Sequence, residues 1–153
     1  MRTTRDLSAA KRIAYQLLKF RARSEREIRD RLKQKGFPLG IIQQTIDYLY
    51  KLKYLNDGEF ALAWTNSRIL KPLGLRRIAF ELKQKGIAPE VIEETFNGLK
   101  GKYQEYDTVM ELAKNKFKKM KDIEEYKAKQ RIFSFLTRRG FKLDTINEVM
   151  DNL

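Results

Sequence analysis

The pentapeptide LKQKG occurs twice in this chain, at residues 32–36 and 82–86. Each copy is followed by an apolar residue, Phe37 in the first and Ile87 in the second. Two identical segments that begin fifty positions apart indicate an internal repeat, and a period of that size restricts the fold to tandem units.

Apolar residues recur at matching positions along the whole chain. At an offset of fifty, Leu32 matches Leu82; at a further offset of fifty-four, Leu82 matches Leu136. The front of the third copy keeps the offset of fifty, so this copy contains about four extra residues, which we place within residues 118–126. The predicted repeats are 1–54, 55–100 and 101–153.

Within each repeat the apolar residues follow a helical spacing. Ile28 and Leu32 are four positions apart, Ile78 and Leu82 repeat this pattern, and strand-like alternation is absent. We therefore predict an all-α protein made of three tandem three-helix repeats. Because a single repeat would leave an apolar face exposed, we expect the repeats to stack as an elongated, curved module.

The repeated glycine is predicted to end a helix. If Gly36 takes a left-handed conformation, Leu32 and Phe37 occupy the two positions that touch in a Schellman motif. Gly86 and Gly140 have the same neighbours. The lysines of the motif lie in the last helical turn, where the negative end of the helix dipole stabilises cations.

Other local signals mark further boundaries. Ser24 with Glu27 predicts a capping box, and Asn56 with Glu59 repeats that spacing. Pro72 disfavours helical geometry at the preceding residue, so residues 70–74 are predicted to form a joint.

The charge is strongly positive. The chain contains 33 Lys and Arg against 20 Asp and Glu, a net charge of +13. Residues 1–54 hold fourteen of the basic residues and five of the acidic ones, and the segment 19–35 is the densest in charge. This excess favours association with polyanions such as nucleic acid, or with proteins that carry them.

The sequence offers little for catalysis. It has no Cys and no His, which excludes disulfides, the usual zinc sites and histidine base catalysis. Glycine-rich phosphate loops are absent, and neighbouring acids such as Glu93 and Glu94 point apart on a helix. Trp64, four positions after Phe60, favours core packing over base stacking. We expect no enzyme activity, cofactor or metal.

Nothing in the sequence indicates a membrane or a secretory leader. No apolar run approaches the ~18 residues that a membrane helix needs. The N-terminal stretch MRTTRDLSAAKR lacks the apolar segment of a signal peptide. We therefore expect a cytoplasmic protein.

The chain resembles the RecX family of bacterial regulatory proteins. The segment 55–87 carries the strongest match, and the segment 21–37 matches through Arg21, Ser24 and Glu27. The matching residues of the second repeat are Asp57, Phe60, Ala61, Ser67, Arg68, Lys71, Pro72, Gly74, Arg77, Ile78, Glu81, Leu82, Lys85, Gly86 and Ile87. Asn56, Thr65 and Asn66 depart from the family pattern.

The resemblance implies a function as well as a fold. Family members are built of tandem three-helix repeats, bind RecA recombinase filaments within the helical groove, and modulate recombination and coprotease activity, mostly by inhibition. We accordingly expect a monomeric partner of RecA filaments that meets single- or double-stranded DNA within the filament.

Basic residues on the second helices are the candidates for binding. Two groups, six residues of the second repeat and four of the first, form this candidate set: Arg68, Lys71, Arg76, Arg77, Lys83 and Lys85; Arg21, Arg23, Lys33 and Lys35. A second hypothesis stays open, because three-helix units resemble helix-turn-helix scaffolds and could bind DNA directly.

Overall fold

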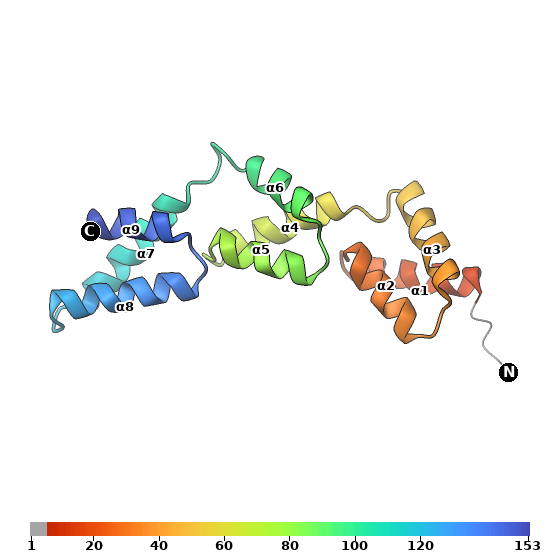
Figure 1. The fold of residues 1–153 in the computed structure, drawn as a ribbon, viewed down its shortest axis with the longest axis horizontal. Coiled ribbons are helices and arrows are strands. Elements are labelled where there is room, and N and C mark those ends of the chain that lie inside the picture. Colours follow the sequence, from red (N-terminus) through yellow and green to blue (C-terminus); the bar gives the residue numbers. More distant parts are fainter. Residues whose placement is uncertain (1–5) are drawn as a thin grey trace. The chain divides into compact units, whose positions relative to one another are not determined.

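The computed structural model describes residues 6–153, so the first five residues of the N-terminal stretch lie outside the described part. Over that described part the chain forms nine helices and no strand (Figure 1). The helices are α1 (Leu7–Phe20), α2 (Glu25–Gln34), α3 (Leu39–Lys51), α4 (Asp57–Ile69), α5 (Leu75–Gln84), α6 (Pro89–Asn97), α7 (Glu105–Lys118), α8 (Glu125–Arg138) and α9 (Leu143–Asp151). The prediction of an all-α fold with three helices per repeat is confirmed.

The helices group into two compact units. The first contains residues 6–63 together with Leu82–Thr95, and the second contains Trp64–Glu81 together with Phe96–Leu153. The second repeat thus contributes residues to both units. The repeat boundaries given above stay a prediction.

Each unit has an apolar core supplied by the predicted positions. In the first unit α1, α2 and α3 bury a cluster that includes Ile28, Leu32 and Leu49. In the second unit α7, α8 and α9 bury a cluster that includes Ile132, Leu136 and Phe141. None of the helices in residues 6–153 combines the length and hydrophobicity that a membrane-spanning segment requires.

The repeated glycines end helices as predicted. Gly36, Gly86 and Gly140 have φ angles of 84°, 82° and 84°, in the left-handed region. The amide after each glycine donates to the carbonyl five residues earlier, as in Phe37 to Leu32 at 3.1 Å. These are the hydrogen bonds of a Schellman motif.

The predicted caps are also present. Ser24 accepts from the amide of Glu27 at 3.3 Å, and the Glu27 carboxylate accepts from the amide of Ser24 at 3.4 Å. Asn56 accepts from the amide of Glu59 at 3.0 Å. Residues 70–74 separate α4 from α5, which confirms the joint.

The four extra residues of the third repeat lengthen its second helix. Helix α8 has 14 residues, whereas α2 and α5 each have 10. Counted back from the terminal glycine, the added turn is residues 125–128. The insertion predicted at 118–126 therefore extends into a helix instead of forming only a loop.

Consecutive repeats meet where two second helices approach each other. In the first unit the Ser24 hydroxyl, at the start of α2, donates to the Lys85 carbonyl at the end of α5, at 2.6 Å. In the second unit the Gly74 amide, at the start of α5, donates to the Arg139 carbonyl at the end of α8, at 2.8 Å. A positive helix N-terminus thus faces a negative helix C-terminus at both junctions.

Two acids, the half-buried Asp57 and the buried Glu105, support the same junctions. Asp57 accepts from the amide of Glu25 at 2.9 Å, and Glu105 accepts from the amide of Leu75 at 3.2 Å. Each acid lies in the first helix of one repeat and caps the second helix of the preceding repeat. Burial raises the pKa of both carboxyl groups above their ordinary values.

Candidate functional site

The ten candidate cations fall into two classes in the structure. Five are exposed and make no salt bridge to any carboxylate in residues 6–153: Lys33, Lys35, Lys71, Arg76 and Lys83. The other five contact groups of the chain itself and are described first.

Glu81 joins two of the candidate cations. Arg68 donates to both of its carboxylate oxygens, with Nε–Oε2 at 2.8 Å and a second guanidinium nitrogen to Oε1 at 2.6 Å. Arg77 lies 3.5 Å from the same carboxylate. The indole of Trp64 donates to Glu81 at 2.9 Å, and the Arg68 guanidinium lies over the indole ring.

The hydrogen bonds of this network favour the ionised form of the Glu81 carboxylate. The hydrogen bonds from Arg68, with further donation by Trp64 and Arg77, lower the pKa of Glu81 below its ordinary value despite partial burial. Trp64 is half-buried and engaged inside the protein, in keeping with packing over base stacking. Arg68 is therefore committed to an intramolecular pair.

Glu27 gathers a second pair of candidate cations. Its carboxylate lies 2.6 Å from Arg21 and 3.8 Å from Lys85. Burial acts to raise the pKa of Glu27, but hydrogen bonds from Arg21 and from the Ser24 amide, with the charge of Lys85, bring it below its ordinary value. Arg21 and Lys85 thus also have an internal partner.

Arg23 is partly buried and lies between the end of α1 and the start of α2. Its Nε donates to the Leu17 carbonyl at 3.4 Å. Burial and the neighbouring charge of Arg21 lower the pKa of this guanidinium. The side chain therefore connects α1 to α2 and projects less freely than a surface arginine.

The five exposed cations lie at three places on or beside the second helices. Lys33 and Lys35 lie at the C-terminal end of α2, and Lys83 lies in the last turn of α5. Lys71 and Arg76 lie on either side of the α5 N-terminus. An ammonium or guanidinium group with no internal carboxylate partner is available to an external anion.

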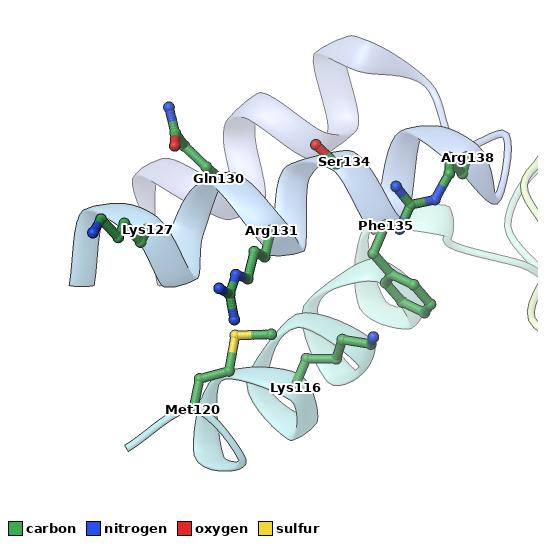
Figure 2. A pocket seen from close by; sticks show the side chains of 8 residues that line it. All are labelled: Lys116, Met120, Lys127, Gln130, Arg131, Ser134, Phe135 and Arg138. Atoms are coloured by element: carbon green, nitrogen blue, oxygen red, sulfur yellow. The ribbon is translucent and has the colours of Figure 1, made fainter. Parts of the chain in front are cut away.

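A basic groove in the third repeat was missed by the sequence analysis. It lies between α7 and α8, has a volume of about 670 Å³, and is lined by Lys116, Met120, Lys127, Gln130, Arg131, Ser134, Phe135 and Arg138 (Figure 2). Arg138 matches a position of the LKQKG motif, which is the only local signal for it. The groove combines residues of α8 with Lys116 of α7 and Met120 after it, so no pattern within a single helix predicts it.

Within residues 6–153, no group of three or more His, Cys, Asp or Glu side chains is placed to hold a metal ion.

Three successive family models match the chain: the first three-helix domain of RecX over residues 10–49, the second over 56–95 and the third over 103–150. Together they cover most of the 153 residues. The chain belongs to the RecX family.

Curated relatives agree with this assignment. The regulatory protein RecX of Bacillus velezensis is 35% identical over 147 residues, which is 95% of this chain and 56% of that protein. That of Prosthecochloris aestuarii is 34% identical over 140 residues, 89% of this chain and 87% of that protein. That of Clostridium perfringens SM101 is 29% identical over 133 residues.

This chain spans 62% of the Clostridium perfringens protein, so some relatives are considerably longer. The relatives are named as regulators, which gives the family a regulatory role. Among solved structures, RecX from Lactobacillus salivarius matches with a TM-score of 0.88 at 21% identity, covering 97% of this chain and 96% of that one. This similarity shows the shared fold.

Proposed function

We propose that this chain is a non-enzymatic regulator that binds RecA nucleoprotein filaments and inhibits their recombination and coprotease activity. It acts as a monomer in the cytoplasm, in DNA repair and the SOS response. Basic residues of the second helices contact the filament and its DNA. Membership of the RecX family, whose members bind RecA filaments, supports the choice of partner.

The unpaired cations carry the proposal. Lys33, Lys35, Lys71, Arg76 and Lys83 are exposed and have no salt-bridge partner among residues 6–153. Neutralising DNA phosphates with such side chains releases counterions and supplies affinity. A cation that already pairs with Glu27 or Glu81 contributes less binding free energy, because its internal ion pair must be broken before it can contact a phosphate.

Two roles therefore divide the candidate set. The exposed five make the external contact, and the paired cations Arg21, Arg68, Arg77 and Lys85 hold the second helices in place. Arg23 contributes through its contact with α1. All ten residues remain part of the proposal, with direct contact assigned first to the exposed five.

The test uses RecA filaments already assembled on single-stranded DNA. Addition of this protein should slow ATP hydrolysis by those filaments, and the effect should weaken as salt rises, because phosphate contacts are screened. Unchanged hydrolysis with saturating protein would count against inhibition. Binding to naked duplex as tight as binding to the filament would favour the direct DNA-binding alternative.

A further inference from the structure

The groove between α7 and α8 is basic and has no acid in its wall. Lys116, Lys127, Arg131 and Arg138 supply four cations, and no carboxylate is among the lining residues. Figure 2 shows Arg131 and Phe135 projecting from α8 toward Lys116 of α7 and toward Met120, which follows the end of α7. The Lys116 ammonium lies 3.9 Å from the centre of the Phe135 ring, which holds that cation at the groove.

The first two repeats neutralise the equivalent surface, and the third does not. Glu81 of α5 is matched by Phe135 of α8, and Glu27 of α2 is matched by Arg131. Glu27 and Glu81 each bind two cations of their own unit. Helix α8 lacks an acid at both positions, so its cations have no internal counter-charge there.

The one acid within α8 lies outside the groove. Glu125 pairs with Lys129 at 3.4 Å, and neither residue lines the groove. The fold therefore leaves the four groove cations to an external anion.

The cations follow one side of α8. Lys127, Arg131, Ser134 and Arg138 are spaced by four, three and four residues, which places them along one helical stripe. Lys127 and Arg131 are about 6 Å apart along the helix axis, from the rise of 1.5 Å per residue. Lys127 lies on the extra turn of α8, so the insertion lengthens the stripe. A row of cations along one helix suits a polymer that carries one negative charge per residue.

Apolar side chains in the groove select the kind of polymer. Met120 and Phe135 lie among the cations. Lys116 and Arg139 lie over the Phe135 ring, so its edge, not its face, is offered to a ligand. In a duplex the bases are stacked inside and only phosphate and sugar would reach this surface. An unpaired strand can place both phosphates and bases in a basic groove with apolar residues.

We propose that this groove binds single-stranded nucleic acid directly, with phosphates at Lys116, Lys127, Arg131 and Arg138 and bases against Met120 and the Phe135 edge. The site is separate from the α2 and α5 cations of the proposed function. It needs no RecA, so the two proposals can fail independently.

The test measures binding of the full chain to a fluorescent thymidylate oligonucleotide by anisotropy, without RecA. The variant carries Lys127→Gln, Arg131→Gln and Arg138→Gln. We expect at least tenfold weaker binding. Loss of three phosphate contacts should also lower the slope of log affinity against log salt by about 2, from ~0.7 per phosphate on a single strand.

A matched control removes the same charge elsewhere. Lys51→Gln, Lys100→Gln and Lys102→Gln change three exposed lysines outside the groove. This variant should bind the oligonucleotide within about twofold of the wild type. Equal weakening in both triple variants would show that net charge alone attracts the strand, and would overturn the site.

A single substitution tests the same idea without removing any cation. Ser134→Glu places an acid within one turn of both Arg131 and Arg138, as Glu81 lies near Arg77 in the second repeat. Binding of the oligonucleotide should weaken while circular dichroism stays unchanged. Unaltered affinity, equally tight binding of duplex, or equal displacement of the strand by polyglutamate would each contradict the proposal.

Discussion

At the scale of single residues, the glycines that end the second helices do more than adopt a left-handed conformation. A Cβ at Gly140 would lie 2.7 Å from the backbone nitrogen of Arg77, and a Cβ at Gly86 would meet the side chain of Arg26. Both contacts join consecutive repeats. The glycine is therefore required by the helix end and by the junction.

We expect Gly140→Ala to destabilise the protein more than Gly101→Ala. Gly101 has a φ of 83° but nothing within 4 Å of its Cβ position, so its replacement measures the left-handed cost alone, ~1–2 kcal/mol. Gly140→Ala adds a clash with the Arg77 backbone, which cannot move away alone. Chemical denaturation of the two variants gives the comparison.

Gly40→Ala is the control for these variants. Gly40 lies in α3 with no neighbour within 4 Å, so alanine there should leave stability unchanged or raise it by up to ~1 kcal/mol. If Gly101→Ala and Gly140→Ala lose the same free energy of unfolding, the junction accommodates the added methyl group at Gly140, which would contradict this prediction.

Glu81 should make stability depend on acid pH. Its hydrogen bonds from Arg68, Trp64 and Arg77 lower its pKa below the ordinary value of 4.5. A lowered folded-state pKa stabilises the protein above the unfolded-state value, and this contribution is lost as pH falls through the folded-state value. Glu81→Gln should cost about 1.5–3 kcal/mol at neutral pH, the range for hydrogen bonds to charged groups.

The difference between wild type and Glu81→Gln should shrink as pH falls below about 4, near the reference pKa of Glu. Urea unfolding at neutral and acid pH measures it. Glu94→Gln is a suitable control, because Glu94 is exposed and has no salt bridge in the described residues. The same pH response in both variants would contradict a role for the Glu81 network.

At the scale of helices, the joint at residues 70–74 acts through its glycine. A Cβ on Gly74 would overlap the backbone of Gly140 and Phe141. Gly74→Ala should therefore loosen the α5–α8 junction. The Arg76 amide donates to the Gly140 carbonyl at 3.0 Å, and its hydrogen exchange should become faster in this variant.

Pro72→Ala, in contrast, should change the free energy of unfolding by under about 1 kcal/mol, mainly through its effect on the unfolded chain. Faster exchange in the proline variant alone would contradict this assignment.

The helices and their ends could be predicted from sequence because their signals are local. Leu32, Gly36 and Phe37 lie within one motif, and Ser24 with Glu27 lies within one turn. The junctions could not be predicted in this way. The hydroxyl of Ser24 meets a carbonyl 61 residues later, and no spacing rule connects them.

The candidate site was predicted only in part for the same reason. Composition and periodicity assigned the cations to the second helices, which is wrong for Arg68, a residue of α4, and for Lys71, which lies between α4 and α5. Arg21 and Arg23 likewise lie before the start of α2. Which cations have an internal partner depends on where Glu27 and Glu81 come to lie against other helices, as when Arg68 reaches across from α4. The groove of the third repeat likewise needs α7 and α8 together.

At the scale of the whole molecule, the cations that give the net charge of +13 differ in their surroundings. Glu27 and Glu81 each pair with two cations, whereas the proposed function assigns the exposed unpaired cations to the filament. Reversing a paired cation would place two acids side by side and damage the fold. A test of filament binding must therefore reverse unpaired cations only.

The variant Lys33→Glu, Lys71→Glu and Lys83→Glu satisfies that condition. Exposed charges contribute little to folding, so helix content should be retained. Binding to RecA-coated single-stranded DNA should weaken at least tenfold, which corresponds to about 1.4 kcal/mol.

The control is the variant Lys51→Glu, Lys100→Glu and Lys102→Glu. The binding of both variants is measured across salt concentrations, on RecA-coated and on naked DNA. Because a filament also presents protein surface, the wild-type salt dependence should be shallower than counting every lysine suggests. If the variant of Lys33, Lys71 and Lys83 binds the filament as tightly as the wild type, these lysines do not contact the filament, and other residues must make the contact.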